Sequence, residues 1–304
     1  MPWLPRLQVF EIDDQTWFPP FLRAHIQNAL TLTWTTPLPL STAPAVLAAR
    51  VLQSELPGED LSSYTFVDFC AGGGGPTPEI ERVVNDSLRA KTPGRRGASF
   101  VMTDLFPNVE SWKRLVKGRK SLFFEDKSVD ARDGGDVVRR WKKEEEGGKE
   151  GGKVCRLFNL AFHHFDDELA GEILKDTLEN SDAFAIFELQ SRTLASFLTT
   201  LLLLPGTLLA APLYAIRNRS LSALVFTYLL PVIPFVLVFD GWMSGLRTRT
   251  PAEVEAMLRE RGGDAAAGWK VRSGRRRFLW PFGYLDWIVC TREEGGSVGS
   301  RPES

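Results

Sequence analysis

The sequence predicts an α/β fold: a Rossmann-like, mostly parallel sheet with helices on both faces, plus a hydrophobic helical insert after the fifth strand. Short apolar runs rich in β-branched and aromatic residues alternate with longer helix-like stretches, as parallel strands with crossover helices do. A glycine cluster follows the first of these runs, where a strand of such a sheet turns into a helix. A long uncharged stretch interrupts the alternation late in the chain.

Length and charge limit the kinds of protein this chain can be. Its 304 residues allow one large domain or two small ones. The 37 Lys and Arg balance 38 Asp and Glu, so the net charge is −1. A general nucleic-acid binder needs a clustered basic excess, and we therefore expect no nucleic-acid partner. Nothing in the composition predicts an oligomeric state.

The cysteines and the first residues indicate where the protein works. Cys70, Cys155 and Cys290 are too far apart in the sequence to form a disulfide framework or a cysteine-rich zinc site. They are typical of buried thiols in a reducing compartment. The first residues also lack a basic segment followed by an apolar one, so we expect a cytoplasmic protein that is not secreted.

The elements follow from apolar periodicity and from turn residues. We expect helices at 21–32, 43–56, 80–90, 166–179 and 251–261. We expect strands at 64–69, 99–104, 121–124, 154–158 and 183–189, with a closing pair at 269–272 and 285–291. The predicted organisation is a helical cap (1–60), a cofactor-binding core (61–192) with a flexible charged loop (132–153), the hydrophobic insert (193–240), the rest of the core (241–292) and a disordered tail (293–304).

The glycine cluster at 72–75 is the strongest sign of a cofactor site. Glycines between a strand and a helix let the backbone turn sharply and approach a ligand, although a plain tight turn is the alternative. A dinucleotide site needs a third glycine where Thr77 stands, and Pro76 and Pro78 remove two N–H donors that would hold a pyrophosphate. A cofactor without phosphates therefore suits this loop better than a nicotinamide dinucleotide does.

These features resemble the class I S-adenosylmethionine-dependent methyltransferases. Asp68, Gly72 and Gly74 match their first motif, while Cys70 replaces its first glycine. The resemblance implies that this loop packs against the methionine part of S-adenosylmethionine. It also implies that Asp104, at the end of the second strand, binds the ribose hydroxyls. The cofactor-binding residues that we predict on this basis are Asp68, Cys70, Gly72, Gly73, Gly74, Asp104, Asp130 and Asn159.

Asp130 is the least secure of these residues, because Asp126 and Asp133 lie in the same polar stretch. The resemblance assigns it to the adenine amino group. The strings FEIDDQTWFPPFLR, FVDFCAGGGGPTP, TDLFPN, SVDAR, FHHF and VFDGWMSGLRTRTPAE further resemble a largely uncharacterised family of bacterial and fungal methyltransferase-like proteins, over about residues 9–289. That family implies no particular acceptor.

His163 and His164 follow the fourth predicted strand, in the segment that faces the methyl group in the enzymes this chain resembles. On a strand, adjacent side chains point to opposite faces, so we expect no metal site there. One of the two histidines is our candidate for the general base, and a structural histidine is the alternative.

Three charged residues are weaker candidates for contacting the substrate. Glu188 ends the fifth strand among apolar residues and needs a partner, for which Arg192 is at hand. Asp240 and Arg247 follow the apolar insert, and we place them at the hinge of a lid.

The insert carries no Asp, Glu, Lys or Arg over 193–216 and again over 220–239. A lid over the acceptor pocket, a monotopic surface that dips into lipid and a membrane-spanning hairpin are all open. Pro205, Pro212, Pro231 and Pro234 interrupt both apolar runs, which counts against two spans. All three interpretations favour a lipophilic acceptor and membrane contact through 193–239.

The resulting hypothesis is a methyltransferase that moves the methyl group of S-adenosylmethionine to a lipophilic or membrane-associated small molecule. The alternative is a catalytically inactive protein of the same fold that binds the cofactor or serves as a scaffold at a membrane.

Overall fold

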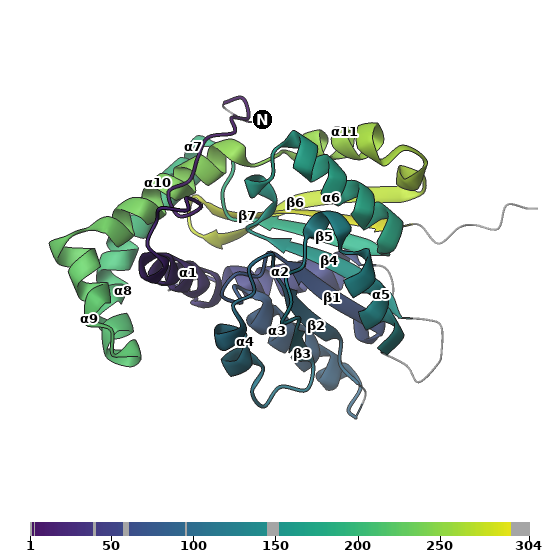
Figure 1. Ribbon diagram of the computed structural model, residues 1–304, viewed down its shortest axis with the longest axis horizontal. Coiled ribbons are helices and arrows are strands. Elements are labelled where there is room, and N and C mark those ends of the chain that lie inside the picture. The colour runs from purple at the N-terminus through teal and green to yellow at the C-terminus, as the bar shows by residue number, and fades with distance from the viewer. Residues whose placement is uncertain are drawn as a thin grey trace, which may run out of the picture.

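The centre of the structure is a seven-stranded sheet in the order β3-β2-β1-β4-β5-β7-β6 (Figure 1). The computed structural model describes residues 2, 4–38, 41–56, 61–94, 96–144 and 152–292. Neighbouring strands are parallel except β7, which runs antiparallel to both β5 and β6. The strands are β1 (Tyr64–Phe69), β2 (Ser99–Thr103), β3 (Leu122–Phe124), β4 (Lys153–Asn159), β5 (Ala183–Glu188), β6 (Trp269–Leu279) and β7 (Gly283–Arg292).

Helices cover both faces of this sheet. The helices of the main body are α1 (Pro20–Thr35), α2 (Pro44–Glu55), α3 (Thr77–Lys91), α4 (Val109–Val116), α5 (Gly135–Glu144), α6 (Asp167–Asn180) and α11 (Pro251–Gly262). Short 3₁₀ turns are η1 (Leu61–Ser63), η2 (Ala131–Asp133), η3 (Phe162–His164) and η5 (Gly263–Ala266). The insert consists of α7 (Leu194–Leu201), α8 (Leu203–Asn218), α9 (Leu221–Leu224), the π-helical turn η4 (Val225–Leu229) and α10 (Val232–Arg247).

Strand β1 shows why this sequence forms a sheet that is buried on both faces. All six of its residues are buried, and its side chains alternate between two hydrophobic cores. Tyr64 and Phe66 enter the core under α2 and α3, where Phe66 stacks on Phe100 of β2. Val67 and Phe69 enter the core under α5, α6 and α11. The predicted Rossmann-like sheet with helices on both faces is therefore confirmed.

The charged segment 132–153 was predicted as a loop, and this prediction is wrong for its first part. Residues 135–144 form helix α5, because Val137, Val138 and Trp141 pack on the core beneath β1 and β4. The charged side chains of this helix obscure an amphipathic pattern that only the packing makes evident. Residues 145–151 of the predicted loop, and the tail 293–304, lie outside the described residues.

The insert is helical, as predicted, but its proline residues do less than expected. Pro212 lies inside α8 without ending it, and the chain from Leu194 to Asn218 forms one continuous apolar rod of two helices. Pro231 does mark a break, where the chain bends by 71° between η4 and α10. By length and composition, Leu194–Asn218 is the one helix of the described residues that could cross a membrane, with the bent pair as a second if it counts as one span.

The insert projects from the main body as an arm, seen at the left of Figure 1. We use "the arm" for residues 194–247. Its helix α10 packs on α1 through a small separate core that includes Ile26, Ile233 and Leu237. Helix α8 is largely exposed to solvent, because Ala211 and Ala215 are its only buried residues. The arm therefore packs on α1 chiefly through α10, with Tyr214 of α8 contacting Asn28, and presents the outer face of α8 to solvent.

A buried ion pair ties β4 to the helix that follows it. Arg156 is fully buried, and its Nη1 lies 2.7 Å from Oδ2 of Asp176 on α6. The guanidinium also donates to Oγ of Ser181 and lies over the ring of Phe69. Removing one partner of such a pair leaves a buried charge without compensation.

We therefore expect Asp176→Asn to lower the free energy of unfolding by about 3 kcal/mol in urea denaturation. Asp136→Asn is the matched control, because Asp136 pairs with Arg139 on the exposed surface of α5. Exposed pairs contribute little, so this control should unfold at nearly the wild-type urea concentration. Equal midpoints for the two variants would contradict the role of the Arg156 pair.

Candidate functional site

The strand order reverses between β1 and β4, and this is where a parallel sheet offers a ligand site. From β1 the chain proceeds outward through β2 and β3, and it then returns to place β4 on the other side of β1. The connections leave the carboxyl ends of these two strands in opposite directions, which opens a crevice above the sheet. Asp68 of β1 and Asn159 of β4 lie at this crevice.

The glycine loop that follows β1 has backbone φ angles that residues other than glycine rarely adopt. Gly72 has φ +52° and Gly74 has φ +108°, and a Cβ at Gly74 would lie 2.3 Å from Cδ1 of Leu115. Cys70, at the position where the resembling family has glycine, also has a positive φ of 66°. Helix α4 holds the loop from outside, since Nε1 of Trp112 donates to the Gly72 carbonyl.

Asp68, Thr77 and Asn159 form a chain of polar contacts under this loop. The Thr77 hydroxyl donates to Oδ2 of Asp68, and Nδ2 of Asn159 donates to the Thr77 hydroxyl at 3.2 Å. The other oxygens, Oδ1 of Asp68 and Oδ1 of Asn159, are buried without a hydrogen-bond partner. Burial raises the pKa of Asp68 to about 7. Two buried acceptors without donors indicate that a group carrying hydrogen-bond donors can be bound beside them.

Asp104 lies next to the loop, as predicted. It follows β2, and its Oδ2 accepts a 2.8 Å hydrogen bond from the backbone N–H of Gly72. Its Oδ1 accepts from the backbone N–H of Phe106. Burial raises the pKa of Asp104, and burial together with the charges of Asp104, Asp68 and Asp130 raises that of the Cys70 thiol. Three carboxyl groups therefore surround one end of the loop.

Asp130 lies on the same edge but already has a partner. It caps η2 by accepting from the backbone N–H of Arg132, and its carboxylate forms an ion pair with the Arg132 side chain at 2.7 Å. The hydrogen bond from Arg132 lowers the pKa of Asp130. Its assignment to an adenine amino group stays a prediction.

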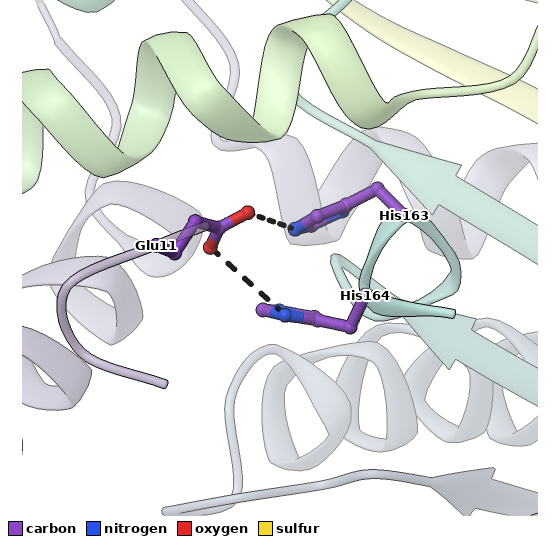
Figure 2. Close-up of side chains that lie close together, drawn as sticks. All are labelled: Glu11, His163 and His164. Atoms are coloured by element: carbon purple, nitrogen blue, oxygen red, sulfur yellow. Dashed lines mark ion pairs between the residues drawn. The ribbon is translucent and has the colours of Figure 1, made fainter. Parts of the chain in front are cut away.

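The histidines after β4 are not arranged as predicted. Phe162, His163 and His164 form the 3₁₀ turn η3 rather than a strand, so the two rings do not point to opposite faces. Their centroids lie 4.2 Å apart with an angle of 35° between the planes. Both rings face the carboxylate of Glu11, which comes from the segment before α1 (Figure 2).

Glu188 has a different partner from the one predicted. Its Oε2 lies 2.8 Å from Nδ1 of His163, and its Oε1 accepts from the His163 backbone N–H at 3.3 Å. Arg192 instead pairs with Glu253 of the α11 capping box. The 3₁₀ turn brings His163 back over the end of β5, which the sequence spacing does not indicate.

Asp240 and Arg247 do not form a hinge, because both lie within the unbroken helix α10. Asp240 accepts the backbone N–H groups of Ile12 and Asp13 at 2.7 and 3.0 Å. Arg247 is 5% exposed, and its guanidinium donates to the carboxylates of Glu11 and Asp14 and to the carbonyl oxygens of His163 and His164.

The electrostatics of this cluster follow from burial and close pairing. Burial lowers the pKa of His164, but a 3.1 Å contact with Asp14 and the charge of Glu11 outweigh it and raise that pKa to about 9. Burial raises the pKa of Asp14, but the hydrogen bonds from His164 and Arg247 hold it well below its ordinary value. Burial raises the pKa of Asp13 to about 6 and that of Asp240 to about 7.

A cavity of about 480 Å³ opens beside Glu188. Its walls come from β5, β7 and the start of α11, with Phe162, Ile186 and Trp287 among the apolar side chains. Arg192 and Arg249 line it as well, whereas the glycine loop does not. The cavity therefore lies beside Glu188, between β5, β7 and α11, rather than at the crevice.

Sequence reasoning missed three residues of this site. Glu11 and Asp14 meet the histidines, and Gln27 of α1 lies over the glycine loop, since a Cβ at Gly73 would be 3.5 Å from its Oε1. The acidic run in FEIDDQ was the available signal for the first two, because three carboxylates among apolar residues need partners. Gln27 carried no signal in the sequence.

Comparison with solved structures finds distant similarities. The methyltransferase domain of bacterial CtHen1 aligns at 12% identity and a TM-score of 0.45 over 82% of this chain and 97% of that one. A cyclopropane-fatty-acyl-phospholipid synthase-like protein from Lactobacillus casei aligns at 9% and 0.44 over 90% and 94%. Magnesium protoporphyrin IX methyltransferase from Synechocystis aligns at 12% and 0.40 over 93% and 88%.

No protein-family model matches the chain, and a comparison with curated proteins gave no match. The strand order with its single antiparallel strand β7 defines the chain as an α/β protein with a Rossmann-like fold. At these identities the similar structures indicate nothing about what this chain binds.

The raised pKa of Asp68 predicts a pH dependence of folding. The ordinary pKa is 3.8 and the folded one is about 7, so between these values the folded chain keeps a proton that the unfolded chain releases. The contribution of the Asp68 carboxyl to the free energy of unfolding is therefore greatest below about pH 4, and it falls as the pH rises to about 7. We expect Asp68→Asn, which cannot ionise, to gain stability relative to wild type as the pH rises from about 4 to about 7, the span between the two pKa values. Urea denaturation of both proteins across this range measures the difference, and a constant difference would contradict the assignment.

Proposed function

We propose that this protein is an S-adenosylmethionine-dependent methyltransferase. The proposal rests on the two buried acceptors at the crevice, Oδ1 of Asp68 and Oδ1 of Asn159. With Asp104 nearby, the polar groups that face the glycine loop are acceptors and carboxyl groups. Such a site suits a cationic ligand with an ammonium group and opposes a pyrophosphate, for which Pro76 and Pro78 also lack N–H donors.

The residues present fit this cofactor in distinct ways. Asp68 and Asn159 would take the ammonium group of its methionine part, and Gly72 and Gly74 would let it lie against the backbone. Asp104 would take the ribose hydroxyls and Asp130 the adenine amino group, as the family resemblance implies. Gln27 would contact the cofactor from the α1 side or move when it binds.

The cofactor supplies a methyl group on a sulfonium, which is already a strong electrophile. The protein then has to align the acceptor with that methyl group, keep water away and accept a proton if the acceptor atom is oxygen or carbon. His163 lies four residues after Asn159 in the sequence. The cluster that the two histidines form with Glu11 and Asp14 therefore lies beside the crevice. We propose that this cluster accepts the proton from the acceptor atom, and that Glu188 positions His163 for this role.

We further propose a lipophilic acceptor that the protein takes from a membrane surface. Leu209, Leu213 and Ile216 share the outer face of α8 and are 71–82% exposed. Leu221 and Leu229 extend this surface onto the neighbouring turns. An apolar surface of this size, on a helix whose one charged residue is Arg217 in its last turn, is costly in water and favourable in the interface of a bilayer.

A monotopic arm accounts for this surface better than two membrane spans do. Two spans would require the second apolar run to cross the bilayer, but it bends by 71°, and its α10 half is packed on α1. The most exposed apolar side chains of the arm lie on α8 and the turns after it, and Arg217 and Arg219 at the tip suit anionic headgroups. This arrangement would place the protein at the cytoplasmic side of a membrane.

Calorimetric titration with S-adenosylmethionine and S-adenosylhomocysteine tests the cofactor. We expect both to bind the wild-type protein at micromolar concentration and NAD not to bind. Gly72→Asp should abolish binding, because it places a second carboxylate where Asp104 accepts the Gly72 N–H and the ligand approaches. Gly118→Asp is the matched control, since Gly118 also has a positive φ (+78°) but lies in an open turn.

Unchanged affinity in Gly72→Asp would place the cofactor elsewhere. A folded wild-type protein that binds neither sulfur ligand would overturn the methyltransferase proposal.

Flotation with phosphatidylcholine vesicles, with and without phosphatidylglycerol, tests the arm. We expect wild type to float, and more so with the anionic lipid. The triple variant Leu209→Asp, Leu213→Asp and Ile216→Asp should lose at least about tenfold in vesicle binding, since each change puts a charge on the inserted face. Trp280→Asp, at an exposed site outside the arm, should bind vesicles as wild type does. Equal flotation of the triple variant would contradict the arm as the contact surface.

A further inference from the structure

We propose that Glu11, His163 and His164 form a binding site for a divalent transition-metal ion. One nitrogen of each ring and one oxygen of Glu11 lie within 4.8 Å of one another. Figure 2 shows both rings turned toward the same carboxylate, each facing a different oxygen. The expectation of no metal here depended on a strand that the structure replaces with a 3₁₀ turn.

The separations between Glu11 and the two rings suit ligands of one ion better than partners in a hydrogen bond. Nε2 of His163 lies 3.7 Å from Oε1 of Glu11, and Nδ1 of His164 lies 3.9 Å from Oε2. Nδ1 of His164 also lies 3.1 Å from Oδ2 of Asp14, so an ion bound there would replace the proton that these two atoms share. Hydrogen bonds between such groups measure about 2.7–3.2 Å. Two ligand atoms each about 2.0–2.2 Å from one zinc-like ion are about 3.4 Å apart at the tetrahedral angle and farther apart at wider angles.

A second observation is the way in which His163 is held. Its Nδ1 contacts Glu188 at 2.8 Å, and both groups are buried. This contact fixes the tautomer that presents Nε2 toward Glu11, so the nitrogen that faces the site carries a lone pair. A metal-binding histidine almost always donates its other ring N–H to a carboxylate or carbonyl in this manner.

The formal charges around the site also suit a dication. Glu11, Asp14 and Glu188 are carboxylates, and Arg247 is the one cation of the described residues that pairs with Glu11 and Asp14 apart from the histidines. A bound ion would replace the proton on His164, and with both imidazoles neutral the cluster carries two excess negative charges. Arg247 holds Oε1 of Glu11 at 2.9 Å, which leaves Oε2 turned to His164. Arg247 thus holds one oxygen of the Glu11 carboxylate and leaves the other facing His164.

The donor set limits which ion binds. Two imidazoles with one carboxylate suit Zn²⁺, Fe²⁺ or Co²⁺, whereas Mg²⁺ and Ca²⁺ prefer oxygen ligands. Three protein ligands leave open positions for another donor. This binding claim does not depend on methyl transfer. If the proposed function also holds, an acceptor oxygen would fill an open position, and the ion would lower the pKa of that oxygen.

Titration of the full-length, tag-free chain with Co²⁺, after treatment with chelator, tests the site through the visible absorption of the bound ion. We expect one equivalent to bind wild type and Zn²⁺ to displace it, while excess Mg²⁺ does not. His164→Gln removes a ligand that is one-third exposed, so the variant should fold and lose at least about 100-fold in Co²⁺ affinity. Glu188→Gln should weaken binding by about tenfold or more, because it removes only the orienting charge.

His25→Gln is the matched control. His25 is the third histidine of the chain, and it contacts Ser222 of the arm, away from Glu11. This variant should bind Co²⁺ as wild type does. Thermal unfolding shows which variants are folded, and titration with S-adenosylmethionine on the same samples keeps this claim separate from the proposed function.

Two results would overturn the metal site. One is a folded wild-type protein that takes up no Co²⁺ or Zn²⁺ at about 1 mM, a concentration at which even a weak site would be occupied. The cluster would then be an ion-pair network that only holds the segment before α1. The other is equal Co²⁺ affinity in folded His164→Gln. Either result with S-adenosylmethionine binding intact would leave the methyltransferase proposal standing.

Discussion

One buried guanidinium organises the functional half of this molecule. Arg247, at the end of α10, donates to Glu11 and Asp14 before α1 and to the carbonyl oxygens of His163 and His164 after β4. It therefore joins three segments that are far apart in the sequence. Because the group is 5% exposed and Glu11 is 3% exposed, removing either would leave a buried charge without a partner. The planar group with several fixed donors suits this role, which a lysine could not fill.

The position of the arm depends on the same contact. The segment that Arg247 fixes leads directly into α1, and α1 supplies one side of the small core that holds α10. Gln27 of the same helix lies over the glycine loop. The crevice, the histidine cluster and the base of the arm thus all contact α1 or the segment that leads into it.

Predictions that depended on local chemistry agree with the structure. Strand 64–69 matches β1, since five aromatic or β-branched residues with a single Asp68, just before a glycine cluster, allow few other conformations. The capping box at Thr250 and Glu253 starts α11 where expected. Predictions of which side chains pair with each other were less accurate. Glu188 pairs with His163 and not with Arg192, and the 3₁₀ turn places both histidines against Glu11. In each case the partner is 25 or more residues away, beyond what spacing can indicate.

The sequence by itself determined the α/β class, the parallel core strands and the glycine loop beside Asp68 and Asp104. These features follow from hydrophobic periodicity and from backbone preferences that act over a few residues. Only the tertiary structure decided that the acidic run before α1 meets the histidines after β4, that α5 forms in a charged segment, and that α8 is left uncovered. Burial energy is summed over contacts between distant segments, so a charge or an apolar side chain reveals its partner only when the chain has folded.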